Sequence, residues 1–343
     1  MRRVVIERAG GHDRLEIREQ PDPTPGPGEV RVRTEAIGVN YADCMVRMGL
    51  YESAKEYVGW PITPGFEFAG VVDEVGEGVN EVEQGQRVFG VTRFGAYSSH
   101  VVTPAALVLP VPHNLTTAQA GGVLVVFLTA WYALCELVRL RPGQKVLVHS
   151  AAGGVGGALV QLAGRAGCQV TGIVGASHKL AGVRELGADH VVDKSKEPLW
   201  DRVGQLVPSG FDVVLDANGA ETLQNSYRHL APGGKLVVYG FHGMLPRSRG
   251  KPSYLKLAWN LFRIPRFHPL RMTNDNRSVL AFNLSYLFDQ VTVFQEATTQ
   301  LSDWLEAGEI RPLPVTEYDF HDVARAHQDL ESGRTTGKLI LRV

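Results

Sequence analysis

The stretch Lys145-Val-Leu-Val-His-Ser-Ala-Ala-Gly-Gly-Val-Gly156 decides the fold of this chain. Residues 145–150 form a short apolar run typical of a buried strand, and a glycine-rich turn follows at once. Against the pattern G-x-G-x-x-G, the turn has Ala151 in the first position and Gly153 and Gly156 in the other two. The middle glycine lets a pyrophosphate approach the backbone, and the last lets the next helix pack closely on the strand. The candidate cofactor contacts here are Ala151, Gly153, Gly154, Val155 and Gly156.

Buried strands and helices alternate downstream of this turn. The further apolar runs lie at 169–175, 190–193, 212–217 and 235–240. Stretches of helix length lie between the runs, at 155–166, 178–187, 198–207 and 220–231. Continuous apolar strands alternating with helices are typical of a parallel sheet covered on both faces. The sequence therefore predicts an α/β fold with a doubly wound, Rossmann-type sheet that binds a dinucleotide.

Residues 1 to about 110 have a different texture. Short apolar segments such as 28–39, 68–76 and 86–91 are broken by turns rich in Gly and Pro. This irregular spacing favours an antiparallel, barrel-like β-rich unit. The end of the chain returns to alternation, with strand-like runs at 316–320 and 338–343 around a helical 321–333.

Composition excludes several classes of protein. The chain has 343 residues, of which 44% are hydrophobic and 21% charged, as expected for a globular protein of about two domains. Lys and Arg number 35 against 36 Asp and Glu, so a net charge of −1 provides no overall field to attract nucleic acid. The three scattered cysteines predict no disulfide framework, and no secretory signal is apparent, which together favour the cytoplasm. The uncharged stretch 115–135 is interpreted as a buried helix rather than a membrane span.

The end of the second strand of the predicted sheet bears on the choice of dinucleotide. A site selective for NAD places Asp or Glu there to bind the ribose 2′-hydroxyl. Residues 175–179 read Gly-Ala-Ser-His-Lys and contain no carboxylate. Ser177 and Lys179 are placed to donate hydrogen bonds to a 2′-phosphate, which favours NADPH. The alternative is that both belong to the solvated first turn of the next helix.

Several motifs resemble those of the medium-chain dehydrogenase/reductase superfamily. They are GFEFAGVVDEVGEGV (65–79), QRVFG (86–90) and HSAAGGVG (149–156). The segment GVNYADCMVRMGLY (38–51) is similar to the zinc-free quinone oxidoreductase branch, and LTAWYAL (128–134) with NRSVLAFNLSYL (276–287) to its VAT-1-like subgroup. The resemblance implies a GroES-like catalytic domain of residues 1–121 and 285–343, and a Rossmann NADPH-binding domain of residues 122–284. It also implies a homodimer, for which the strand-like AFNLSY (281–286) would pair at the sheet edge.

The resemblance also bears on a metal. Zinc enzymes of the superfamily carry a cysteine ligand where this chain has Asn40, and Gly-His-Glu where it has Gly65-Phe66-Glu67. An amide and a phenyl ring are not zinc ligands. No pair of histidines has the spacing H-x-x-x-H, so we predict no metal, and we interpret Glu67 as a structural carboxylate.

Without a metal to stabilise an alkoxide, the accessible chemistry is hydride transfer from NADPH to an electrophilic quinone or α,β-unsaturated carbonyl. The charge that develops on oxygen then needs hydrogen-bond donors and a proton. In related enoyl-thioester reductases a tyrosine in the position resembling Tyr51 donates the proton, so Tyr51 is the first candidate. Tyr41 and Asn40 are alternatives, and Asp43 is placed to orient a hydroxyl or the nicotinamide. The competing interpretation of each tyrosine is a half-buried ring with one hydrogen bond.

Further cofactor contacts are implied by the resemblance or by position after a strand. Thr129 resembles a threonine near the nicotinamide ribose, although it also suits the core of a helix. Arg334 matches an arginine that touches the 2′-phosphate, with a solvated surface arginine as the alternative, and Lys194 is a weaker candidate. The residues that follow strands are Asn218, Gly240, Phe241 and, as a cofactor-side contact or exposed loop residue, His242.

Residues 245–272 are basic and aromatic and contain no acidic residue. The basic residues are Arg247, Arg249, Lys251, Lys256, Arg263, Arg266 and Arg271, with Trp259, Phe262 and Phe267 between them. We interpret the segment as a lid or oligomer surface over a pocket for a bulky apolar acceptor; contact with an anionic membrane surface is the second choice. Rival functions are a pathway-specific enoyl or enone reductase, a nucleotide-binding protein without turnover, and a zinc-dependent alcohol dehydrogenase.

Overall fold

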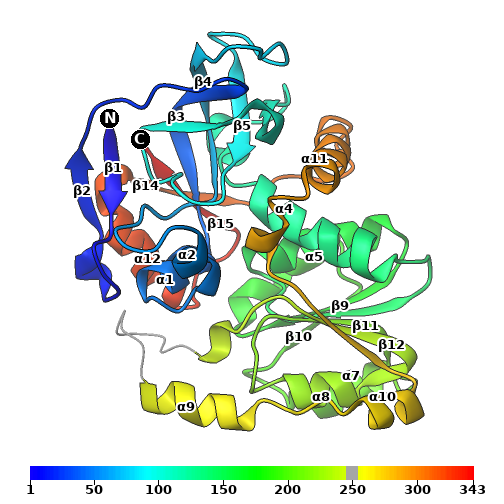
Figure 1. The fold of residues 1–343 in the computed structure, drawn as a ribbon. Helices are drawn as coiled ribbons and strands as arrows, with labels where there is room; N and C mark the ends of the chain where they lie inside the picture. Colours follow the sequence, from blue (N-terminus) through cyan, green and yellow to red (C-terminus); the bar gives the residue numbers. More distant parts are fainter. Residues whose placement is uncertain (245–253) are drawn as a thin grey trace. The chain divides into compact units, whose positions relative to one another are not determined.

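The computed structural model describes residues 1–244 and 254–343, which divide into two compact units (Figure 1). The first unit contains Met1–Leu128 and Ser285–Val343, and the second contains the described residues from Thr129 to Leu284. The division falls within helix α4 (Leu124–Trp131), later than the boundary at 121 expected from the sequence. The reason is that the first turn of α4 is tied to the first unit, because the backbone N–H of Val125 donates to Glu67 Oε2 at 2.9 Å.

The first unit is built on a seven-stranded sheet in the order β14-β15-β3-β4-β5-β7, with β6 paired to β3. Its strands are β3 (Glu29–Val39), β4 (Glu67–Val75), β5 (Arg87–Val91), β6 (His100–Pro104), β7 (Val108–Pro110), β14 (Val315–Asp319) and β15 (Lys338–Arg342). All neighbours are antiparallel except β14 and β15, and β1 (Arg2–Val5) and β2 (Glu16–Glu19) form a separate antiparallel pair. Side chains along the start of β3 alternate between buried and more exposed, as one covered face requires. The predicted antiparallel β-rich unit is confirmed.

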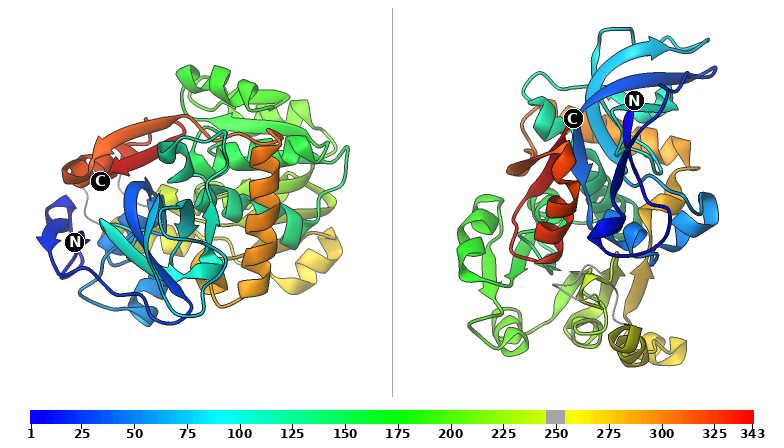
Figure 2. Two further views of the ribbon diagram at one scale, coloured as in Figure 1. Left: turned by 90° about the horizontal axis from the view of Figure 1, so that it is seen from above. Right: turned by 90° about the vertical axis from the view of Figure 1, so that its left-hand side faces the viewer.

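Helices of the first unit border this sheet and its buried core. They are α1 (Tyr41–Arg47), α2 (Glu52–Tyr57), α3 (Thr117–Ala120), α11 (Val291–Glu306) and α12 (Val323–Glu331), with short turns η1 (His12–Arg14), η2 (Ala105–Leu107), η6 (Leu284–Leu287) and η7 (Phe320–Asp322). The long α11 is the orange helix in the left view of Figure 2. Helix α12 contacts both β15 and α1. Its buried residues Val323, Ala326 and His327 follow helical spacing, so a histidine shares the apolar face.

The second unit contains six parallel strands in the order β10-β9-β8-β11-β12-β13. They are β8 (Lys145–Val148), β9 (Gln169–Val174), β10 (His190–Asp193), β11 (Phe211–Asp216), β12 (Leu230–Val238) and β13 (Ser278–Ala281). The order runs outward from β8 in both directions, which is the doubly wound topology predicted from the alternating runs. Its reversal beside β8 brings the turns after β8 and β11 together at the carboxyl edge of the sheet.

Helices connect these strands in the expected places. They are α5 (Gly154–Arg165), η4 (Ser177–Lys179), α6 (Leu180–Glu185), α7 (Leu199–Leu206), α8 (Leu223–Arg228), η5 (His242–Met244), α9 (Tyr254–Arg263) and α10 (Pro269–Asp275), after α4 and its π-helical continuation η3 (Tyr132–Val138). The prediction of a strand at 281–286 is wrong, because the strand lies earlier in the chain. The edge strand is β13, and it ends at Ala281 because its last partner, Val238, ends β12. No helix among the described residues is long and apolar enough to cross a bilayer.

Candidate functional site

The turn after β8 is shaped by close contact between helix and strand. A Cβ built on Gly156 would lie 2.2 Å from the carbonyl oxygen of Ser150 and 2.8 Å from Cα of Ala151, so any side chain here would force α5 away from the strand. Gly153 is the residue before α5 and has an ordinary φ of −84°, and a Cβ there would meet only the Ser150 carbonyl oxygen at 3.3 Å. Gly156 therefore serves packing, whereas Gly153 keeps the approach to the backbone open.

Helix α5 begins at Gly154 immediately after this turn. The first N–H groups of an α-helix have no partner within the helix and carry partial positive charge, which makes the helix start a binding place for an anion. The first turn contains Gly154, Val155 and Gly156, so no bulky polar side chain competes for those N–H groups. A pyrophosphate fits this end of the helix.

Three strand ends meet beside the turn. The hydroxyl of Ser150 donates to Asn218 Oδ1 at 3.0 Å and lies 3.4 Å from Nε2 of His242. Asn218 is 4% exposed, and its Nδ2 has no hydrogen-bond partner among the described residues. An unsatisfied buried donor costs about 1–3 kcal/mol, so an acceptor atom of a bound ligand would be stabilised here. Ser150, whose φ is +54°, is a site residue that was not predicted.

The ends of β9 and β10 form a second polar group. Ser177 donates from Oγ to Asp193 Oδ2 at 2.6 Å, and Ser195 donates to Asp193 Oδ1 from both its N–H and its hydroxyl. The hydrogen bonds from Ser177 and Ser195 hold the pKa of Asp193 below its usual value. Lys194 is next in the chain, and its N–H donates to the Val174 carbonyl.

A carboxylate thus does lie near Ser177, although no carboxylate occurs in 175–179. It comes from the neighbouring strand. The run HVVD at 190–193 ends in this carboxylate, Asp193. Because parallel strands end at a common edge, the run could have predicted a carboxylate near Ser177. The oxygens of Asp193 accept hydrogen bonds from two hydroxyl groups, those of Ser177 and Ser195. Lys179 lies two residues after Ser177, and burial lowers the pKa of the Lys179 ammonium.

The other predicted cofactor contacts occupy varied settings. Thr129 is 9% exposed within α4, and Gly240 lies against Ala217. Phe241 is 42% exposed just after the β12 strand end. Arg334 is exposed in the turn after α12 and belongs to the first unit, not to the unit that contains the glycine turn.

A buried ion pair occupies the first unit where the resemblance places zinc ligands. Glu67, 1% exposed at the start of β4, accepts from Asn40 Nδ2 at 2.9 Å and from Lys338 Nζ at 2.7 Å. Lys338 also donates to Asn40 Oδ1 at 2.5 Å. Because the Val125 N–H donates to its other oxygen, both oxygens of the Glu67 carboxylate accept hydrogen bonds. Lys338 was not predicted, because its position at the start of the last strand gives no local sign of a buried ion pair.

Asp43 is fully buried one helical turn from Asn40. Its Oδ2 accepts from the Asn40 N–H at 2.7 Å and from the Tyr97 hydroxyl at 2.9 Å, and its Oδ1 accepts from the Gly65 N–H at 3.1 Å. Gly65 has φ of +102°, and a Cβ there would clash with Tyr97 at 2.5 Å, so the loop can reach Asp43 only with glycine. Burial raises the pKa of Asp43 to about 7, despite the hydrogen bonds that oppose the rise.

Tyr51 and Tyr41 flank this region of the chain. Tyr51 precedes α2, is half-buried, and makes edge contacts with the rings of Phe66 and Phe94 at centroid distances of 5.8 and 6.4 Å. It also lines a small pocket with Val46 and Ile62. Tyr41 is half-buried at the first position of α1. Both interpretations made for Tyr51, a proton donor and a packed ring, remain compatible with this setting.

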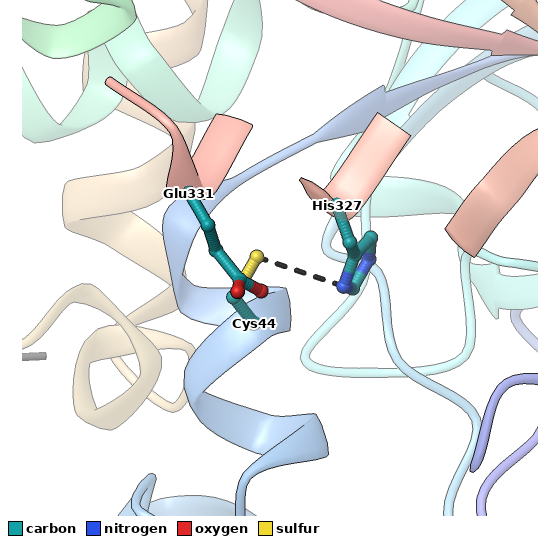
Figure 3. Close-up of side chains that lie close together, drawn as sticks. All are labelled: Cys44, His327 and Glu331. Atoms are coloured by element: carbon teal, nitrogen blue, oxygen red, sulfur yellow. Dashed lines mark hydrogen bonds between the residues drawn. The ribbon is translucent and has the colours of Figure 1, made fainter. Parts of the chain in front are cut away.

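A further polar group lies beyond Asp43 and was not predicted. Tyr97 contacts His327 Nε2 at 3.1 Å, and His327 Nδ1 lies 3.6 Å from the Cys44 sulfur. The side chains of Cys44, His327 and Glu331 point toward one another from α1 and α12 (Figure 3). Such a set has the chemistry of a zinc site. The spacing H-x-x-x-H does not detect this group, because α12 provides His327 and Glu331 at H-x-x-x-E and the third member, Cys44, is distant in the sequence.

The basic segment is described only in part. Arg247, Arg249, Lys251 and the side chain of Lys256 lie outside the described residues. On α9, Trp259 and Phe262 are 62% and 83% exposed, and Arg263, Arg266 and Arg271 are exposed after them. Phe267 is different, since it packs on Tyr227 in the core of the second unit.

Residues 26–113 match the family model of the alcohol dehydrogenase GroES-like domain, and residues 186–341 match that of a zinc-binding dehydrogenase. The chain is 35% identical over 346 residues to the synaptic vesicle membrane protein VAT-1 homolog of Rattus norvegicus, spanning 99% of this chain and 84% of that protein. It is 32% identical over 344 residues to part of a phenolphthiocerol/phthiocerol polyketide synthase of Mycobacterium tuberculosis, spanning 99% of this chain and 15% of that protein. Escherichia coli quinone oxidoreductase, in a structure complexed with NADPH, has the same fold with a TM-score of 0.86, 27% identity and 100% of both chains covered.

These matches and the two units define a class of protein: an oxidoreductase-type protein in which an α/β nucleotide-binding unit is joined to a GroES-like β-rich unit. The chain belongs to the medium-chain dehydrogenase/reductase superfamily, in its VAT-1-like, zinc-free branch. The resemblance drawn from the motifs is therefore confirmed. One matching family is described as zinc-binding, but Asn40 and Phe66 stand where the resemblance places zinc ligands.

Proposed function

We propose that this protein is a zinc-independent, NADPH-dependent reductase that transfers hydride to a quinone or another α,β-unsaturated carbonyl compound. The observation that carries the proposal is the Asn40–Glu67–Lys338 cluster. In it a lysine ammonium, not a metal ion, is paired with the buried carboxylate. Such a site suits acceptors that are already electrophilic.

The residues of the second unit fit NADPH. The N-terminus of α5 with Gly153 would hold the pyrophosphate, and the unpaired Asn218 amide would meet a polar atom of the nicotinamide half. Lys179 and Lys194 would bind the 2′-phosphate, where cationic donors are strong partners, and Ser177 would join them by turning its hydroxyl from Asp193 to the phosphate. Thr129, Gly240, Phe241 and, from the first unit, Arg334 complete the proposed set. When bound, NADPH supplies the hydride.

The protein's own part is to orient the acceptor and to manage charge and protons. Reduction of an enone or quinone builds negative charge on the acceptor oxygen, and hydrogen-bond donors stabilise that charge. Tyr51 is the proposed proton donor and Tyr41 the alternative, whereas the Asn40 amide, whose Nδ2 donates to Glu67, would contribute at most a hydrogen bond. Asp43, buried and with a pKa raised by burial to about 7, is positioned beside Asn40 to exchange a proton near neutral pH.

The test is consumption of NADPH, with NADH as control, against an ortho-quinone, a simple enone and an enoyl thioester. Saturable turnover with NADPH preferred supports the proposal. Binding of NADPH measured by fluorescence, with no turnover on any acceptor, would instead support a nucleotide-binding protein. Metal analysis of the same sample addresses the zinc-dependent alternative: stoichiometric zinc with alcohol oxidation would contradict the proposal.

A narrower function is favoured by one relative. The match to a segment of a polyketide synthase points to a pathway-specific enoyl or enone reductase as the second candidate. Turnover confined to the enoyl thioester would favour it over quinone reduction.

We also infer a homodimer. Strand β13 pairs with β12 on one side, and no other strand of the described residues pairs with its outer edge, which could pair with a second copy. Light scattering at several concentrations tests this, and a monomer throughout would contradict it.

A further inference from the structure

We propose that six side chains form a proton relay between the protein surface at His12 and the buried carboxylate of Asp43. Its members are His12, Glu331, Cys44, His327, Tyr97 and Asp43, and we call the set the Asp43–His12 relay. The inference rests on the proposed function in one respect, which is that reductase turnover is the process that would use the proton.

The inner half of the relay consists of hydrogen bonds among fully buried groups. The Tyr97 hydroxyl donates to Asp43 Oδ2 at 2.9 Å, and the same oxygen lies 3.1 Å from His327 Nε2. With the phenol proton directed at Asp43, Nε2 of His327 is the donor to Tyr97, so Nδ1 accepts from the Cys44 thiol at 3.6 Å. Asp43, Tyr97 and His327 are each 0% exposed.

The outer half leads to the surface. The Glu331 carboxylate lies within 4.8 Å of the Cys44 sulfur, and its Oε2 lies 3.2 Å from His12 Nε2. His12 is the first member with access to solvent, with 17% of its side chain exposed against 2% for Glu331. Figure 3 shows the middle of this path, with Cys44 between the imidazole and the carboxylate. The relay therefore connects α12 to α1 and then to the loop that contains Tyr97.

Each member can take one proton and pass one on. To reprotonate an ionised Asp43, Tyr97 gives up its phenol proton and takes one from His327 Nε2. His327 takes the Cys44 thiol proton at Nδ1, and Cys44 is refilled through Glu331 from protonated His12. One O–H bond forms at Asp43 and one N–H bond breaks at His12, with no change of oxidation state. Solvent then restores the His12 proton.

The surroundings keep the intermediate members neutral. Burial, with the nearby charge of Arg47, holds the pKa of His327 well below its usual value, and burial raises the pKa values of Cys44 and Tyr97 well above theirs. Neutral members favour a concerted shift, because an isolated buried ion would be costly. The charged groups that face the relay are Arg47 beside Glu331, Asp13 near His12, and Lys338 and Glu67 near Asp43.

A metal ion is the competing use of Cys44, His327 and Glu331. The Arg47 guanidinium opposes it, since Arg47 NH2 lies 2.7 Å from Glu331 Oε1 and both side chains are at most 2% exposed. A divalent cation would have to share this carboxylate with a buried cation. The relay keeps the Arg47–Glu331 pair intact.

The first experiment measures Asp43 directly in the protein without cofactor. The infrared carboxyl band that is lost in D43N reports its protonation after a rapid pH jump. We expect Y97F and C44A to slow the response at least about tenfold, because each removes an exchangeable proton from the path. C44S keeps a hydroxyl in the same place and should respond within about threefold of the wild type. The matched control is Y318F, which removes a tyrosine–aspartate hydrogen bond elsewhere in the unit.

Equal response rates in the wild type, Y97F and C44A would overturn the relay. So would stoichiometric bound zinc that is lost in C44A, which would identify a metal centre. The second experiment measures the solvent isotope effect on enone reduction. It should grow in C44A but not in C44S, as a purely structural role of Cys44 would not predict. If no acceptor is reduced while the pH-jump difference persists, the proposed function fails and the relay stands.

Discussion

Lys338 Nζ lies 2.7 Å from Glu67 Oε1, and the two side chains are 4% and 1% exposed. They come from the last strand, β15, and from β4, with β3 between them in the sheet. Charges that deep in a protein are stable only as partners. This pair therefore links β15 to β4 across β3 near Asn40. It also explains why Glu67 has a structural rather than a catalytic role.

Replacing Lys338 with Met should destabilise the fold strongly. The change leaves Glu67 ionised and buried without its cation, and breaking such a pair costs roughly 3–5 kcal/mol. Urea unfolding checks the loss. Adding E67Q should recover much of it, because the remaining partners, Asn40 and the Val125 N–H, suit a neutral amide. K55M removes an exposed pair with Glu52 and should cost less than about 1 kcal/mol. A loss of that small size in K338M would contradict the assignment.

Asp43 should make stability depend on pH in an unusual direction. Its pKa is about 7 when folded against an ordinary value of 3.8, so the folded state holds a proton that the unfolded chain has lost between those values. The stabilisation is complete below about pH 4 and is lost as the pH rises through 7. His327 and His12 act oppositely, since burial lowers the pKa of each.

The difference between the wild type and D43N isolates the Asp43 contribution. The free energy of unfolding of the wild type, relative to D43N, should fall from pH 5 to about pH 7 in urea titrations and level off above that pH. D13N, at an exposed position, should show no such trend. A difference that stays flat across this range would mean that Asp43 remains ionised throughout.

The Rossmann-type unit was predictable because its signals are local. The run 145–156 contains a strand, a turn and a helix start, and each apolar run that follows reports one buried strand. The edge strand was the weak point. AFNLSY has a strand-like pattern, but pairing ends at Ala281 because β12 offers no partner beyond Val238. Strand ends are set by the neighbouring strand, which a single segment does not reveal.

Side chains that act in groups were hardest to foresee. Asn40 and Asp43 were named from one motif, but their partners Lys338 and Tyr97 come from distant strands and loops. His327 follows the apolar spacing of α12, so its sequence context resembles a core position. Burial of polar groups becomes visible only when the tertiary contacts are known, since each is tolerated because the others pair with it.

The two turn glycines should fail in different ways. In G156A the new methyl group meets the Ser150 carbonyl oxygen at 2.2 Å, so overpacking should cost about 1–3 kcal/mol of stability. In G153A the nearest atom lies 3.3 Å away and φ is ordinary, so the fold should stay near wild-type stability while NADPH affinity falls. Thermal unfolding and a fluorescence titration with NADPH separate the two effects. Unchanged affinity in a folded G153A would place the pyrophosphate elsewhere.

Selectivity for NADPH should depend on the lysines near the ends of β9 and β10. The double variant K179M/K194M removes two cationic donors, so the Kd for NADPH should rise about tenfold to a hundredfold while that for NADH changes little. Titration with both nucleotides provides the comparison. K196M, one residue beyond Ser195, serves as the control for simple loss of charge. Parallel weakening of both nucleotides would show that the lysines support the fold rather than the 2′-phosphate.

Tyr51→Phe tests the proposed proton donor with little change in packing. The ring keeps its edge contacts with Phe66 and Phe94 and loses only the hydroxyl. A positioned acid contributes about a hundredfold or more when proton transfer limits the reaction, so kcat for the enone should fall by that order. A quinone yields a stabilised anion that water can protonate, so its kcat should fall less than about threefold. Y57F, at a 39% exposed ring, is the control. Equal losses on both acceptors would assign Tyr51 to substrate packing and move the proton-donor role to Tyr41.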